Sequence, residues 1–179
     1  LAQGSLHPGG LATTRDLAEL CRIQRNNAVL DVASGNGETA CFLARTFGAS
    51  VVGIDRAEEM IRRAKAKASA SGLKVNFKKA DAASLPFDDA SFDAAIFEST
   101  LCFLDKPRVL GEMVRVVRPG GCVGMHDLCW KEGAPVKLKQ ALAEIEKEHP
   151  ETLKGWRKLF EGAGLAQIES LPGVAWAVP

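Results

Sequence analysis

The sequence predicts an α/β protein with a mostly parallel, doubly wound sheet that is covered by helices on both faces. Strand-length apolar segments alternate with segments whose apolar residues recur at the spacing of a helix. Several of the strand-like segments are short and continuously apolar, which is typical of parallel strands buried between two helical layers. Right-handed crossovers between such strands complete a three-layer α/β/α arrangement.

Five strands are expected in the first three quarters of the chain and one or two in the remainder. The six clearest are AVLDVA (28–33), SVVGID (50–55), KVNFKK (74–79), FDAAIFE (92–98), CVGMHD (122–127) and LAQIES (165–170). A seventh, antiparallel strand is expected in VAWAV (174–178), unless the chain is truncated before it.

Apolar stripes and stop signals locate the helices between these strands. The stripes are Leu17, Leu20 and Cys21; Met60, Ile61, Ala64 and Ala68, ending at Gly72; and Leu110, Met113, Val114 and Val117, beginning after Asp105. After the fifth strand, residues 135–149 and a segment ending near Gly162 are also expected to be helical.

Composition excludes several classes of protein. The net charge of +1 gives no reason to expect binding to nucleic acid or to an anionic membrane. No apolar run approaches the roughly 20 residues that span a bilayer. The five cysteines are an odd number without a CxxC pair, so we expect no disulfide framework and no metal site, and a cytoplasmic protein.

The loop ASGNGET after the first strand is the strongest candidate for a binding site, because its glycines let the backbone approach a ligand closely. A phosphate loop would need a lysine where Glu38 follows Gly37. A dinucleotide loop prefers a third glycine where Ala40 stands. A nucleoside with an amino-acid tail needs neither feature, and a plain tight turn also remains an alternative.

Two carboxylates end the next strands of the predicted sheet. Asp55 could bind both hydroxyls of a ribose, or it could cap the following helix in a box formed with Glu58. Asp81 could accept a hydrogen bond from an adenine amino group, with the Ala82 N–H nearby, or it could form an Asx-turn.

These pieces together resemble the class I S-adenosylmethionine-dependent methyltransferases, in the branch that modifies small molecules. The resemblance covers residues 26–128 and consists of four segments in order: VLDVASGNG, VVGID, ADAASLPFDDASFDAAIF and LGEMVRVVRPGG. It implies a Rossmann-like methyltransferase fold in a single domain, 1–179. The parts are an N-terminal arm and helix (1–25), a cofactor-binding core (26–128), and acceptor-side helices and last strands (129–179).

The resemblance also implies roles for residues at the matching positions. The loop would approach the methionyl part, Asp55 with Arg56 would bind ribose, and Asp81 with Ala82 would bind adenine. Met60 would pack on the adenine, and the residues after the fourth strand would line the other side of the cofactor. The complete set is Asp31, Ala33, Ser34, Gly35, Asn36, Gly37, Asp55, Arg56, Met60, Asp81, Ala82, Glu98 and Ser99. Ala33 replaces the first glycine of the family's loop, which implies a negative φ there or a shifted loop.

The acceptor side is less constrained by the sequence. His126 is the best candidate for a base or an acceptor contact, with Asp127 to orient it. Gly10 or Thr14 of the N-terminal segment is a further hypothesis for a contact to the methionyl group. Cys102 and Cys129 follow the fourth and fifth strands and would suit arsenite as an acceptor if they were reactive thiols.

The sequence therefore predicts methyl transfer from S-adenosyl-L-methionine to a small-molecule acceptor, with neither nucleic acid nor a membrane as partner. The alternatives are an NAD(P)-dependent oxidoreductase and a non-catalytic protein that binds S-adenosylmethionine. Ala40 and the position of Asp31 before the loop count against the oxidoreductase. The oligomeric state stays open.

Overall fold

Seven strands form one sheet in the part of the chain that the computed structural model describes, residues 7–171 and 174–178. They are β1 (Ala28–Val32), β2 (Ser50–Asp55), β3 (Asn76–Lys79), β4 (Phe92–Glu98), β5 (Val117–His126), β8 (Ala166–Leu171) and β9 (Val174–Val178). Their order in the sheet is β3-β2-β1-β4-β5-β9-β8. The first five strands are parallel, and β9 is antiparallel to both of its neighbours, β5 and β8. The predicted antiparallel seventh strand in VAWAV is confirmed.

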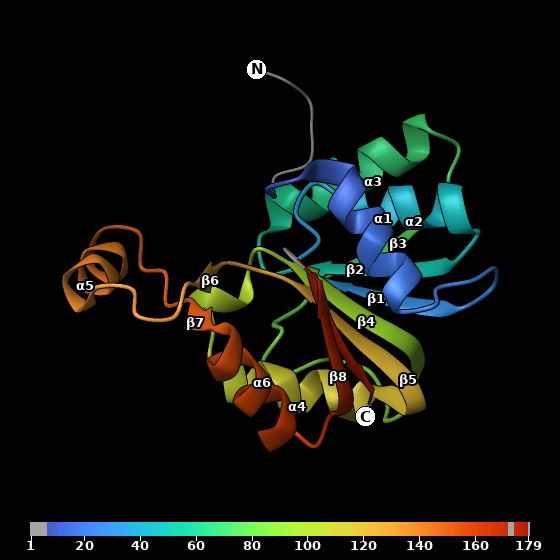
Figure 1. Ribbon diagram of the computed structural model, residues 1–179. Coiled ribbons are helices and arrows are strands. Elements are labelled where there is room, and N and C mark those ends of the chain that lie inside the picture. Colours follow the sequence, from blue (N-terminus) through green and yellow to red (C-terminus); the bar gives the residue numbers. More distant parts are fainter. Residues whose placement is uncertain (1–6, 172–173, 179) are drawn as a thin grey trace.

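Helices cover both faces of the sheet, as Figure 1 shows. On one face lie α1 (Gly10–Leu20), α2 (Glu38–Phe47) and α3 (Glu58–Ala70), and on the other lie α4 (Lys106–Val116) and α6 (Leu153–Gly162). The helix α5 (Val136–Ile145) projects away from the sheet and has no buried residue. The predicted three-layer α/β/α arrangement is therefore confirmed.

The two faces of the sheet belong to two separate apolar cores, because successive side chains of a strand point to opposite sides. Val29 and Ile96 pack into the core under α1, α2 and α3. Their chain neighbours Leu30 and Phe97 pack into the second core, where Met113 of α4 also lies. Apart from Asp31, Asp93 and Glu98, both strands are therefore apolar on both faces, which is the pattern that predicted a sheet covered twice.

Local signals in the sequence account for the helix ends. The Asp105 side chain accepts a hydrogen bond from the Arg108 N–H at the start of α4, as expected for an N-cap. At the end of α3, Gly72 has a φ of +64° and the Leu73 N–H donates to the Ala68 carbonyl.

Three details differ from the prediction. The strand β5 begins at Val117 rather than 122, because Val117 already pairs with Phe92 before an irregularity that ends where Cys122 pairs with Ala94. A short 3₁₀ helix, η1 (Leu101–Phe103), follows β4. A two-stranded parallel sheet joins β6 (Cys129–Trp130) to β7 (Glu151–Thr152), and pairs this short carry too little sequence pattern to be recognised.

None of the helices in the described residues is both long and apolar enough to cross a bilayer.

Replacement of Gly124 by alanine should test how closely α1 packs on β5. A Cβ atom there would lie 2.5 Å from the Cys21 Sγ and 3.0 Å from the Leu17 Cδ1. We expect Gly124→Ala to lower the free energy of unfolding by about 1–3 kcal/mol, measured by chemical denaturation.

The matched control is Gly111→Ala in α4, where a Cβ would meet no atom within 4 Å. Alanine is the better helix former, so this control should raise stability by about 0.5–1 kcal/mol. Equal effects of the two substitutions would contradict the close packing of α1.

Candidate active site

Two adjoining cavities lie at the carboxyl edge of the sheet, between β1 and β4, where the strand order reverses. Helices that follow β1 and β4 leave on opposite faces of the sheet, so their loops part and leave a crevice. One cavity has a volume of about 210 Å³ and the other about 450 Å³. Ala33, Ser99 and Thr100 line both, so the two volumes form one elongated site.

The glycine-rich loop forms one wall of this site. The Ser34 N–H donates to the Ile54 carbonyl over 2.7 Å, and the Gly37 N–H donates to the Ser34 carbonyl over 2.8 Å. Gly37 has a φ of +79°, and a Cβ there would meet Phe77 and Ala64 at 2.7 and 2.8 Å, so only glycine fits.

Ala33 adopts the left-handed conformation with a φ of +58°. The expectation of a negative φ at this position is wrong. The hydrogen bond from the Ser34 N–H to the Ile54 carbonyl holds Ala33 in a backbone conformation that glycine adopts more easily. This conformation costs about 1–2 kcal/mol. Ser99, on the opposite wall, is also left-handed with a φ of +51°. Such strain in residues that line a cavity is typical of functional sites.

Asp55 ties the end of β2 to this loop. Its Oδ2 accepts a hydrogen bond from the Gly35 N–H over 3.0 Å, and its Oδ1 accepts one from the Ala57 N–H over 2.8 Å. The alternative that Asp55 caps α3 is wrong, because the N-cap position is Ala57, which lacks a capping side chain.

Six of the predicted binding residues line the larger cavity: Ala33, Asp55, Arg56, Asp81, Ala82 and Ser99. The Oδ1 of Asp81 accepts a hydrogen bond from the Ala83 N–H over 2.9 Å, which is the predicted Asx-turn. Met60 is half-buried on α3 and is not among the residues that line either cavity in the described part of the chain. Phe103 and Leu104, which the sequence analysis did not single out, complete the wall.

Three acidic residues line the smaller cavity: Asp31 from β1, Glu38 from the start of α2 and Glu98 from β4. Asp31 is 3% exposed, and its Oδ2 has no hydrogen-bond partner. Burial, together with the nearby charge of Glu98, raises the pKa of Asp31 well above its ordinary value. Burial also raises the pKa of Glu98. The cavity therefore disfavours negative charge on these two carboxyls unless a cation lies beside them.

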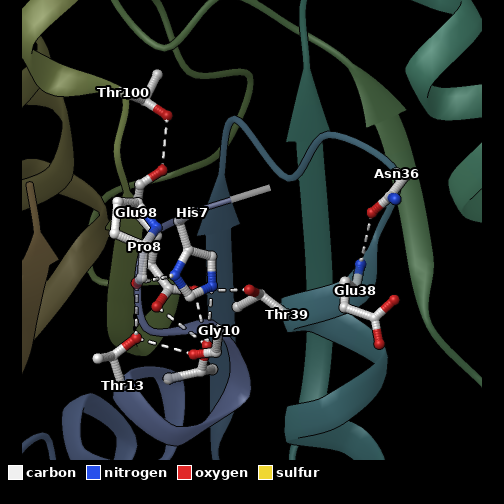
Figure 2. Close-up of polar contacts among 10 residues, drawn as sticks. His7, Pro8, Gly10, Thr13, Asn36, Glu38, Thr39, Glu98 and Thr100 are labelled. Carbon is white, nitrogen blue, oxygen red and sulfur yellow. Dashed lines mark hydrogen bonds and ion pairs between the residues drawn. The ribbon is translucent and has the colours of Figure 1, made fainter. Parts of the chain in front are cut away.

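Glu98 is surrounded by polar groups from the N-terminal segment and α2, as Figure 2 shows. The Thr39 hydroxyl donates to its Oε2 over 2.6 Å, and the Thr14 hydroxyl lies 3.1 Å from both carboxylate oxygens. The His7 Nε2 lies 3.2 Å from the same Oε2. The sequence analysis considered Thr14 but missed His7 and Thr39, because 59 or more residues separate them from Glu98. The structure places Gly10 at the start of α1, outside the residues that line the two cavities.

His126 ends β5 beside this cluster. It is buried, and its ring lies edge-on to His7 with 5.4 Å between the ring centroids. Burial lowers the pKa of His126, and the charge of His7 lowers it further, so the neutral ring is favoured. His126 is not among the described residues that line the smaller cavity, so its role as a base toward an acceptor stays a prediction.

Asp127 does not orient His126, contrary to the sequence-based hypothesis. Its Oδ2 accepts hydrogen bonds from the backbone N–H groups of Thr100, Leu101 and Cys102, and its Oδ1 accepts one from Leu128. The carboxylate therefore caps η1, and no hydrogen bond joins it to His126 within the described residues.

The two cysteines considered as ligands for arsenite are not activated. Cys102 is buried, and burial with the charge of Asp127 raises the pKa of its thiol. Cys129 is exposed, and partial burial with the charge of Glu132 raises its pKa as well. Raised pKa values keep both sulfurs in the thiol form at neutral pH, so the hypothesis gains no support.

Comparison with known proteins identifies relatives of this chain. A family described as "Methyltransferase domain" matches residues 29–121. An uncharacterized protein of Haemophilus influenzae is 32% identical over 97% of this chain and 72% of its own length. Demethylmenaquinone methyltransferase of Thermus thermophilus is 47% identical over 52% of this chain and 43% of its own length.

Solved structures show the same fold. A protein of Galdieria sulphuraria, described as a candidate sarcosine dimethylglycine methyltransferase, superposes with a TM-score of 0.82 and 28% identity. The match covers 90% of this chain and 65% of the other. The chain thus spans between two fifths and three quarters of these relatives.

Replacement of Asp31 by asparagine should stabilise the protein in the absence of ligand. A carboxyl group whose pKa rises on folding lowers the free energy of unfolding at every pH at which the folded protein holds it ionised. This cost vanishes below the ordinary pKa of the group, about 3.9. We therefore expect a gain of about 1 kcal/mol or more at neutral pH, or about 2–4 °C in Tm, that shrinks as the pH falls toward 4.

The control for this experiment is Asp88→Asn, at an exposed turn position, which should leave Tm unchanged across the same pH series. A gain at Asp31 that does not depend on pH would contradict the electrostatic cause.

Proposed function

The chain belongs to the class I S-adenosylmethionine-dependent methyltransferases, and we propose that it transfers a methyl group to a small-molecule acceptor. S-adenosyl-L-methionine is the cofactor of this family. The observation that carries the proposal is the elongated site, which has acidic groups in both parts and buried polar atoms that the protein leaves without partners: the Oδ2 of Asp31, the Oγ of Ser34 and the Oγ of Ser99. Buried polar atoms without partners are rare in proteins and indicate a missing ligand.

The larger part of the site fits a nucleoside. Each oxygen of Asp55 accepts one backbone hydrogen bond and retains a lone pair for a ribose hydroxyl. Asp81 uses one oxygen in its turn and has a second for an adenine amino group, while Ala82 lines the same wall. Phe103 and Leu104 supply apolar surface for the base.

The smaller part of the site fits an amino-acid tail. The positive ammonium group of a methionyl moiety beside Asp31 would offset the cost of burying that carboxylate. The backbone of Asn36 lines the same cavity and can bind the tail's carboxylate. Glu98 and Ser99 form the opposite wall.

Chemistry at this site depends on alignment. The bound cofactor supplies a methyl group that its sulfonium already activates. The chain has to hold acceptor and cofactor in line and exclude water, so orientation carries much of the rate. A base is required only for an acceptor that loses a proton.

The proposal of a small acceptor rests on the relatives and on the dimensions of the site. The names of the Thermus and Galdieria relatives give demethylmenaquinone, and sarcosine with dimethylglycine, as their acceptors. The chain's net charge of +1 offers no field that would attract nucleic acid.

Thermal-shift measurements with separate ligands test the choice of cofactor. At concentrations about 100 times the Kd, S-adenosylhomocysteine should stabilise the protein by about 2.7 kcal/mol. NADH at the same concentration should have no effect. Stabilisation by NADH alone would contradict the proposal, and a methylated product from a panel of small acceptors would exclude a protein that only binds the cofactor.

Replacement of Asp55 by alanine should weaken the binding of S-adenosylhomocysteine. The loss of hydrogen bonds to a charged acceptor is worth about 1.5–3 kcal/mol, or roughly 10- to 150-fold in Kd, measured by isothermal titration calorimetry. Asp88→Ala at the exposed turn is the control and should leave Kd unchanged. If Asp55→Ala lowered stability but left Kd unchanged, Asp55 would serve only as an acceptor for Gly35 and Ala57.

A further inference from the structure

Three side chains at the smaller cavity form a cluster, and the methyl-transfer proposal uses only one of them, Glu98, as part of the cavity wall. They are His7 from the segment before α1, Glu98 from the end of β4 and His126 from the end of β5. One nitrogen or oxygen atom from each lies within 4.8 Å of the other two. The His7 and Glu98 side chains are only 6% and 5% exposed, and His126 is 7% exposed. Three polar side chains of this kind are costly to bury without a purpose.

The contact of His7 with Pro8 leaves the other ring nitrogen of His7 facing the carboxylate of Glu98. The His7 Nδ1 lies 3.2 Å from the Pro8 carbonyl, which can only accept, so Nδ1 carries a proton. In the neutral ring the Nε2 then bears a lone pair, and it faces the Glu98 Oε2 at 3.2 Å. The hydroxyl of Thr14 is near both but supplies only one proton. Either a proton or a metal ion between Nε2 and Oε2 would satisfy both atoms.

A proton on His7 would satisfy this pair but not the third member of the cluster. The His126 Nδ1 is buried without a hydrogen-bond partner. A metal ion shared by the three side chains would take one ligand atom from each of them, because neutral imidazole and carboxylate are both metal ligands.

We propose that His7, Glu98 and His126 bind a divalent transition-metal ion of the zinc class. Two imidazole nitrogens and one carboxylate are a set that suits Zn²⁺ or Fe²⁺, whereas Mg²⁺ and Ca²⁺ prefer oxygen ligands. The separation of 3.2 Å between Nε2 and Oε2 matches two ligands of a tetrahedral ion with bonds of about 2.0–2.1 Å. The cluster as a whole needs to close by about an ångström to form all three bonds.

In metal sites the ligand side chains are themselves held in place by hydrogen bonds to neighbouring groups. The groups around this cluster act in the same way. The Thr39 hydroxyl donates to Glu98 over 2.6 Å, and the Pro8 carbonyl holds the ring of His7 with Nε2 turned inward. Figure 2 shows these partners arranged around Glu98. The sequence analysis expected no metal site, because positions 7, 98 and 126 meet only through the fold.

The position of the ion gives it a role in the reaction. His7 and Glu98 line the cavity of about 210 Å³, so an ion held by the three side chains would lie at the edge of the proposed site. An acceptor oxygen bound there would be polarised and would lose its proton more readily. This role rests on the proposed function, whereas the binding of the ion does not.

Metal binding can be measured without any methyl-transfer assay. Protein freed of metal by a chelator is titrated with Co²⁺ and followed by visible absorption, and Zn²⁺ is titrated by calorimetry. The exposed Cys129 is replaced by serine throughout, so that this thiol cannot bind the ion. We expect one ion per chain, with the absorption of Co²⁺ in a four- or five-coordinate site and no band from a thiolate ligand. Mg²⁺ should not compete.

Variants assign the ligands. His7→Ala, Glu98→Gln and His126→Ala should each weaken Zn²⁺ binding at least tenfold. His149→Gln is the matched control, since it removes the third histidine of the chain, which is exposed, and it should leave binding unchanged. Thr39→Val should weaken binding by about 10- to 100-fold, as expected for loss of a supporting hydrogen bond. Circular dichroism verifies that each variant is folded.

The inference is overturned if the Cys129→Ser protein, with all three ligands intact, shows no saturable Co²⁺ or Zn²⁺ binding. It is also overturned if folded His126→Ala binds the ion as tightly as before. Either result alongside a normal thermal shift with S-adenosylhomocysteine would leave the proposed function intact. Metal binding without any response to S-adenosylhomocysteine would instead contradict the proposed function.

Discussion

The reversal of strand order between β1 and β4 is the constraint on which the rest of the structure depends. β1 pairs in parallel with β2 on one side and with β4 on the other, so that Asp31 stands opposite Gly53 and Ile96. The chain leaves the two central strands toward opposite faces of the sheet, and the gap between their loops cannot be filled by a helix. The walls of the site begin at these two strand ends and continue over the ends of β2 and β3.

Keeping this gap open costs the protein stability, and the costs gather at the same edge of the sheet. Asp31 and Glu98 are acidic groups whose pKa values burial raises, Ala33 and Ser99 are left-handed, and His126 has a nitrogen without a partner. Elsewhere the two apolar cores are filled by ordinary aliphatic and aromatic side chains. A site that binds cations and polar ligands explains why the fold retains these groups.

Patterns that are local in the sequence predicted most of the fold. Short, mostly apolar runs marked β1, β2, β4 and β5, and caps such as Asp105 and Gly72 marked helix ends, because both signals arise from neighbouring residues. The cavity-lining residues Asp55, Asp81 and Ala82 were singled out because each lies at or just after the end of a strand. The conformation of Ala33 was not predicted, since a bond to Ile54 on another strand fixes it. The pairing of β6 with β7 was missed for the same reason.

The sequence by itself determined the fold class, the order of the strands along the chain, the family and its cofactor, because these depend on periodicity and on motifs of a few adjacent residues. Only the tertiary structure decided what surrounds Glu98. His7, Thr14, Thr39 and His126 reach it from four separate segments, and no spacing in the chain records that meeting. It likewise decided that Asp127 holds η1 rather than His126, since a carboxylate bonds to whichever N–H groups the fold brings within reach.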